Sequence, residues 1–136
     1  MLNESMAREI REARQAGIRA HNSLRQARKR LDSARGWGIY DMLGGGLISS
    51  LIKHSKISDA REDVDRARRD LEAFSRELRD VDLPEVNIDG FLTFADFFFD
   101  GLLADLLVQK RINDARAQID RACMQVEDIL RRLPNV

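Results

Sequence analysis

Cysteine and proline are scarce in this sequence, and each scarcity excludes something. The 136 residues include one cysteine and two prolines. The lone Cys123 cannot form a disulfide within the chain, and neither proline lies inside an apolar-periodic stretch, so long helices can run unbroken. Residues 1–15 hold no apolar stretch of the kind that a signal peptide contains. We therefore expect a cytoplasmic protein.

An excess of charge of one sign and long hydrophobic runs are also missing. Lysine plus arginine and aspartate plus glutamate number 23 each, so no bulk field draws the chain to nucleic acid, and we expect no nucleic-acid partner. The arginines alternate with acids, as in residues 61–66, which indicates solvated helix faces with ion pairs. Acids such as Asp96 and Asp100 interrupt the longest apolar runs, so none reaches the roughly 18 residues that a membrane-spanning helix needs.

What the sequence does contain is apolar residues spaced alternately by three and four positions. This spacing is the seam of a left-handed coiled coil. It predicts a single helical domain, 1–136, with an all-α fold: an antiparallel, coiled-coil-like bundle of three long helices near 4–35, 45–81 and 92–133. The seam residues are Ile10, Ala13, Gly17, Ala20, Leu24, Ala27, Leu31 and Ala34 in the first stretch, Ile57, Ala60, Val64, Ala67, Leu71, Phe74, Leu78 and Val81 in the second, and Val108, Ile112, Ala115, Ile119, Ala122, Val126, Ile129 and Leu133 in the third.

Alanine recurs once in every heptad of the first stretch. The positions are Ala13, Ala20, Ala27 and Ala34. Small side chains at a seam let the backbone of a neighbouring helix approach closely. We therefore predict a tight antiparallel contact between the first helix and a later one.

The second and third stretches resemble each other beyond the seam. At a shift of 55 residues, Ile57, Asp59 and Ala60 coincide with identical residues at 112, 114 and 115, and further identities follow without a gap. A shared heptad alone would match the apolar seam, whereas charged residues match here as well. We predict an internal repeat with units at about 41–78 and 96–133.

Within each unit the apolar stripe changes side. A face nearly opposite the seam that begins at Ile57 carries Leu47, Ile48, Leu51 and Ile52. In the second unit the same face carries Leu102, Leu103, Leu106 and Leu107. One interpretation is a helix break at 53–58 and again at 109–113, which would split each helix into a short and a long one. The other is a straight helix that offers two faces to two partners.

This second stripe needs a cover, because a monomeric three-helix bundle buries one stripe per helix. Pairing of the patch across the two-fold axis of a homodimer supplies a cover, and an unidentified protein partner would supply another. The interface candidates are Leu47, Leu51, Phe98, Phe99, Leu102, Leu103 and Leu106.

Phenylalanine is concentrated in one segment, 91–100. Core or subunit interface is the ordinary interpretation of such a segment. The alternative function is association with a membrane surface through 91–108 and 39–52. We do not favour it, because the polar residues here, Asp96 and Asp100, are acidic and anionic headgroups repel them.

A glycine turn provides the other alternative function. Gly44, Gly45 and Gly46, with Lys53 following, could bind a phosphate or another small anion through backbone N–H groups at a helix N-terminus. The spacing fits neither a P-loop nor a dinucleotide fingerprint, and only Gly46 recurs in the second unit, as Gly101. A tight connection with close backbone packing is the simpler interpretation.

The residue types that carry catalysis or bind metals are isolated. His21 lies beside the seam residue Ala20 and is expected to face solvent, and Cys123 is expected to be an inert, partly buried thiol. Nothing supplies the base and oxyanion site of a nucleophile or a ligand cluster, so we predict no catalytic residue, metal or cofactor. The favoured function is a non-enzymatic interaction or scaffold protein that acts through a homo-oligomeric or partner-binding apolar helix face.

Overall fold

The computed structural model describes residues 3–33, 47–98 and 112–136. Within these ranges the chain forms four α-helices and no strand, which confirms the all-α prediction for them. None of these helices is long and apolar enough to cross a membrane. The helices are α1 (Glu4–Ser33), α3 (Leu47–Arg79), α4 (Ile88–Phe97) and α6 (Ile112–Arg132).

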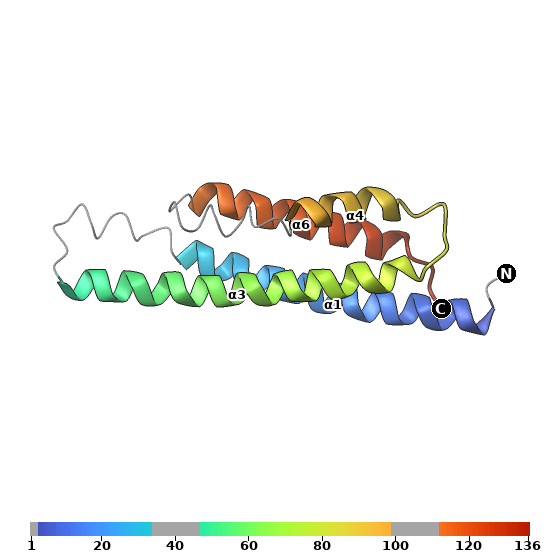
Figure 1. Cartoon of the computed structure of the whole chain (residues 1–136), viewed down its shortest axis with the longest axis horizontal. Coiled ribbons are helices and arrows are strands. Elements are labelled where there is room, and N and C mark those ends of the chain that lie inside the picture. The colour runs from blue at the N-terminus through green and yellow to red at the C-terminus, as the bar shows by residue number, and fades with distance from the viewer. Residues whose placement is uncertain (1–2, 34–46, 99–111) are drawn as a thin grey trace.

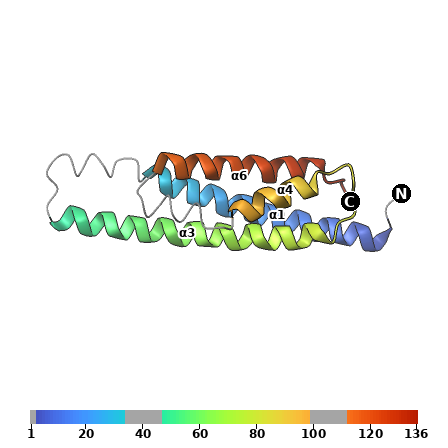
Figure 2. The same cartoon turned by 45° about the horizontal axis from the view of Figure 1, so that its top comes forward.

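The three longer helices lie side by side along the long axis of the molecule. Helix α1 packs against both α3 and α6 and runs in the opposite direction to them (Figure 1). The short α4 contacts α3 and α6, and lies in front of α1 when the molecule is turned (Figure 2). Helix α1 therefore supports both helices of the predicted repeat from one side, and α4 covers them from the other.

The predicted seams form the core. Every seam residue whose side chain is described is buried, so that part of the prediction is confirmed. Burying one Leu or Ile side chain contributes roughly 1.5–3 kcal/mol, and the stripes of three helices meet here. The buried seam residues are Ile10, Ala13, Gly17, Ala20, Leu24, Ala27, Leu31, Ala60, Val64, Ala67, Leu71, Phe74, Leu78, Val81, Ala115, Ile119, Ala122, Val126, Ile129 and Leu133.

Helix α1 approaches its neighbours closely at Gly17. A Cβ atom at this position would lie 2.7 Å from Cδ2 of Leu130 on α6 and 2.9 Å from the ring of Phe74 on α3. Both distances are shorter than carbon atoms tolerate, so a side chain here would push the helices apart. The neighbouring seam positions Ala13 and Ala20 are fully buried. The small residues of α1 thus face the later helices.

Helix α3 is continuous from Leu47 to Arg79. The interpretation with a break at 53–58 is therefore wrong for this unit, and the helix is unbroken as in the alternative, whose two partners stay a prediction. The physical reason is composition, since this stretch contains neither glycine nor proline, the residues that break helices. Most of the matching place in the second unit, 109–113, lies outside the described residues.

The third predicted helix, near 92–133, corresponds to α4 and α6, and residues 99–111 between them lie outside the described residues. Helix α4 begins earlier than predicted, at Ile88, because Asn87 caps it. The side-chain oxygen of Asn87 accepts a hydrogen bond from the backbone N–H of Gly90 at 3.2 Å. Such a cap satisfies a donor that the first turn leaves without a helical partner.

The end of α6 is held against α1 by a side chain. The guanidinium of Arg14 donates hydrogen bonds to the backbone carbonyls of Leu133, at 3.1 Å, and Pro134. Carbonyls at the end of a helix have no partner within the helix, so a cation that donates to them stabilises this end.

Candidate functional site

Most residues predicted for an interface or an anion site fall where side chains are not described. Leu47, Leu51 and Lys53 belong to the continuous helix α3, but the placement of their side chains is not described. The residues that lie outside the described chain are Gly44, Gly45, Gly46, Phe99, Leu102, Leu103 and Leu106.

Phe98 is the predicted interface residue whose side chain is described, and it is buried in the core of its own chain. Its ring lies 6.1 Å from that of Phe94 between centroids. Earlier in α4, Phe91 meets Phe74 of α3 edge-to-face at 5.2 Å, a favourable geometry for two rings. Phe97 is 55% exposed. Within its described part, 91–98, the aromatic segment therefore attaches α4 to the core through Phe91 and Phe98 and exposes Phe97.

A set of ionisable groups lines an open groove of about 370 Å³ between α1 and α6. It brings together residues that are about a hundred positions apart in the chain, because the two helices run antiparallel. The lining residues are His21, Arg25, Arg28, Lys29 and Asp32 from α1, and Asp120, Cys123 and Glu127 from α6.

His21 does not face solvent as expected. Its side chain is 20% exposed, and Nε2 lies 2.8 Å from Oε1 of Glu127. Because an ionised carboxylate only accepts hydrogen bonds, Nε2 donates. The expectation failed because it considered α1 alone, whereas the flank of α1 beside Ala20 is covered by α6.

Arg28 links the two sides of the same groove. Its Nε donates to Oδ1 of Asp120 at 2.6 Å, and its NH1 nitrogen pairs with Asp32 one helical turn away. Both carboxylates raise the pKa of the guanidinium, the hydrogen bond to Asp120 being the largest cause. Asp32 also lies 2.9 Å from Nε of Arg116 on α6. This arrangement joins α6 to α1 through Arg28 and Arg116, each of which lies beside a carboxylate of the other helix.

Cys123 sits in the groove as a protonated thiol. Burial raises its pKa to about 11, and the negative charges of Glu127 and Asp120 contribute in the same direction. The attacking species in thiol chemistry is the thiolate. At neutral pH this residue is therefore a poor nucleophile, despite the imidazole of His21 on the other wall.

Helix α3 meets α1 through a different pair. Asp63 is buried, with 8% of its side chain exposed, and its Oδ2 accepts from Nε of Arg30 at 2.9 Å. Asp59 lies farther from Arg30, at 3.9 Å. Ser23 of α1 donates to the carboxylate of Asp70. These contacts flank the seam on the side of α1 opposite the groove.

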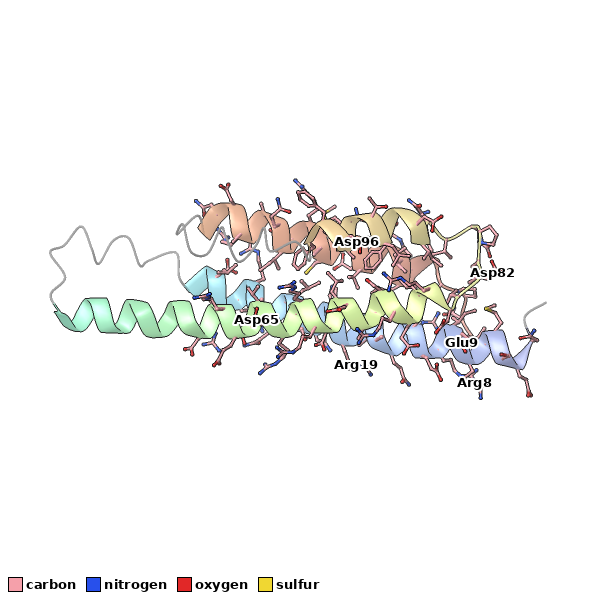
Figure 3. The ribbon with its side chains drawn as sticks, in the orientation of Figure 1. Arg8, Glu9, Arg19, Asp65, Asp82 and Asp96 are labelled. Atoms are coloured by element: carbon pink, nitrogen blue, oxygen red, sulfur yellow. The ribbon has the colours of Figure 1, made fainter. Side chains whose placement is uncertain are left out.

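A group of three carboxylates lies between α1 and α3. Oxygens of Glu9, Glu12 and Glu77 come within 4.8 Å of one another, and Figure 3 labels Glu9 where the two helices adjoin. Oxygen ligands in this number suit a hard cation such as Ca²⁺. The groups are half-exposed or exposed, however, and such clusters are common on charged helices without an ion, so we assign no metal centre to them.

Comparison with known proteins adds no relative. No protein-family model, no curated protein and no solved structure matches the chain. An assignment of function must therefore come from the surfaces and groups described above.

Proposed function

We propose that the protein is a non-enzymatic interaction protein: an antiparallel helical bundle that pairs with a second copy through the apolar stripe outside its seam. A cytoplasmic location is part of this proposal. The continuity of α3 carries it. Because the helix is unbroken from Leu47 to Arg79, positions 47, 48, 51 and 52 share one face, whose centre lies nearly opposite the seam that packs on α1.

The extent of α3 beyond α1 supports the same proposal. Arg30, close to the described end of α1 at Ser33, pairs with Asp59 and Asp63. Residues 47–58 of α3 therefore continue past that end, by about 18 Å at 1.5 Å per residue, and no other described helix lies beside them (Figures 1 and 2). A helix segment with apolar residues on a defined face is what a two-fold partner can cover.

The chemistry of the described groups is consistent with a role without catalysis. The groove between α1 and α6 holds ion pairs that join two helices, and its thiol is protonated at neutral pH. We therefore place the function of the chain in contacts between helices, with a second copy as the first partner and an unidentified protein as the alternative.

The test is the mass in solution with one apolar side chain replaced by an acid. In sedimentation equilibrium at micromolar concentration we expect about twice the 15.6 kDa chain mass, and the single chain mass for Leu51→Glu. The matched control is Met124→Glu, at a methionine of α6 that is 68% exposed, which should stay dimeric. A monomeric wild-type chain, or a Leu51→Glu variant with unchanged mass, would refute the proposal. Binding of the wild-type chain to anionic liposomes would favour the membrane-surface alternative instead.

A further inference from the structure

The face of α1 opposite its seam is basic in its middle part and carries acids toward both ends. The exposed residues at alternating spacings of three and four are Glu4, Arg8, Arg11, Gln15, Ile18, Asn22, Arg25, Lys29 and Asp32, with Glu12, Arg19 and Gln26 beside them. From residue 15 to residue 29 the helix contains no acid, and we call the outward face of this part the basic face. It is about 21 Å long at 1.5 Å per residue, and it includes Ile18, with 47% of its surface exposed.

Two cations of the basic face, Arg25 and Lys29, border the groove toward α6, whereas Arg19 does not line it. The ion pairs of α1 involve His21, Arg28, Arg30 and Asp32, which lie on the flanks toward α3 and α6. Among the described residues, no carboxylate forms an ion pair with Arg8, Arg11, Arg19, Arg25 or Lys29. Arg8 and Arg19 are labelled along the lower edge of the molecule in Figure 3.

The opposite side of the molecule is acidic. Between Arg79 and the end of the described segment at Phe98 there is no basic residue, and every charged residue there is exposed. We call residues 80–97 the acidic edge. It comprises the turn after α3 and the helix α4, which lies across α3 and α6 from α1 (Figures 2 and 3). The exposed acids are Asp80, Asp82, Glu85, Asp89 and Asp96, and the exposed Phe97 follows the last of them.

We propose that the basic face of α1 binds the acidic edge of a second copy of this chain. The basic face carries cations and no acid between residues 15 and 29, and the acidic edge carries acids and no cation, in a molecule of no net charge. Each also has one exposed large apolar side chain, Ile18 on the basic face and Phe97 on the acidic edge. A complementary protein surface buries such side chains, whereas a polyanion would leave them in water. The occupant that fits both observations is therefore this chain itself.

The positions of the two surfaces determine the kind of assembly. They lie on opposite sides of one molecule, so a single pair of chains cannot satisfy both, and each added copy leaves a free basic face and a free acidic edge. Contacts of this head-to-tail kind extend into open chains unless a rotation closes them. The assembly is independent of the apolar dimer proposed above and would link such dimers further.

Salt is the first experimental variable. Exposed charges separated by more than a Debye length are screened, and that length falls from about 30 Å at 0.01 M salt to about 3 Å at 1 M. At about 0.02 M salt we expect the mean mass in sedimentation to rise with protein concentration. At about 0.5 M salt we expect this rise to be at least tenfold less steep. An apolar contact would not weaken with salt in this way.

Charge reversal identifies the two surfaces. The variant Arg19→Glu/Arg25→Glu leaves the basic face with two acids against Lys29, and Glu85→Lys/Asp89→Lys/Asp96→Lys leaves the acidic edge with three cations against two acids. Each variant alone should lose the salt-dependent growth in mass, because its two surfaces then carry net charge of one sign. An equimolar mixture should regain it, because each reversed surface meets a complementary surface on the other variant. Circular dichroism confirms that each variant is folded, and Arg19→Gln/Arg25→Gln serves if the reversal unfolds α1.

The matched control is Arg69→Glu/Arg121→Glu, two exposed arginines of α3 and α6 outside both surfaces, with the same change in net charge. It should assemble like the wild-type chain. Assembly that is insensitive to salt, equal loss in the control, or a mixture that stays dissociated would overturn the proposal. A second contrary outcome concerns DNA. If the wild-type chain binds a short DNA duplex, and the Arg19→Glu/Arg25→Glu variant loses this binding but keeps its self-association, the proposal is also overturned. The Leu51→Glu variant, monomeric through the apolar stripe, should keep the salt-dependent contact, which separates the two proposals.

Discussion

Helices α3 and α6 pack on the same α1. Their buried apolar seams are alike, whereas the polar contacts beside the seams differ. At the positions related by a shift of 55 residues, the seam is buried in both, as at Leu71 and Val126 or Leu78 and Leu133. The polar edges differ. On α3 the contact is made by a buried Asp63 with Arg30, whereas on α6 it is made by an exposed Asp120 with Arg28. One helix can thus hold two similar helices because its two flanks offer different polar partners.

The largest expected effects come from the seam itself. Phe74 of α3 and Ile129 of α6 occupy matching positions, and both are buried. Phe74→Ala should lower the free energy of unfolding by about 3–5 kcal/mol and Ile129→Ala by about 2–5 kcal/mol. We expect the α3 variant to lose more, because Phe74 also meets Phe91 and fills the space beside Gly17.

Urea unfolding followed by circular dichroism measures both losses. Phe97→Ala is the control, since the exposed ring of Phe97 should contribute within about 0.5 kcal/mol. A smaller loss for Phe74→Ala than for Ile129→Ala would mean that α6, and not α3, makes the tighter contact with α1.

The polar edges should differ by less. Asp63→Ala removes a buried acceptor from Arg30, and we expect a loss of about 1–3 kcal/mol. Asp120→Ala removes an exposed partner from Arg28, which keeps Asp32, so the expected loss is about 0–1 kcal/mol. The gain in helix propensity is the same in both variants, and the difference between their urea midpoints therefore reports burial. Equal losses would show that the exposure of the two carboxylates does not matter.

The smallest expected effect on stability at neutral pH concerns Cys123, which matches Arg68 of α3. Its pKa is raised from 9.0 to about 11 in the folded chain, so folding favours the protonated thiol. The stabilisation is present below pH 9, where the unfolded chain also keeps its proton, and is lost as the pH rises through 11. Near pH 8 we expect the thiolate fraction of Cys123 to be about 100-fold lower in the native chain than in urea. Iodoacetamide should therefore modify the native chain correspondingly more slowly. Equal rates in the two states would contradict the shifted pKa.

The helices and their buried faces could be predicted because they depend on local spacing. A period of 3.6 residues gives the same seam whichever helix it packs against, so Leu24 and Ile119 could be assigned to the core from the sequence. The start of α4 was missed although a local signal existed, the cap residue Asn87, because the apolar pattern alone was followed. Of the two interpretations near Lys53, a break and a continuous helix, the break is wrong because a change of apolar face does not itself break a helix without glycine or proline.

The groups that could bind or react depend on which helices are neighbours, and sequence spacing does not give that. The contact between His21 and Glu127 joins residues 106 positions apart, and the carboxylates of Glu9 and Glu77 meet only because α1 and α3 are antiparallel. The net charge of the sequence could not predict the basic face of α1 for another reason. A net charge of zero is a sum, and it does not record that Arg19 and Asp96 lie on opposite sides of the molecule.

The hydrogen bonds that Arg14 donates to the carbonyls of Leu133 and Pro134 have a practical consequence for labelling. They bring the end of α6 beside α1, and the first turns of α1 lie toward the same end of the molecule as the last turn of α6 (Figure 1). A fluorescent label attached to either of these turns would crowd this end alone. The far end of the molecule, where the first turns of α3 project, would stay accessible to whatever binds there.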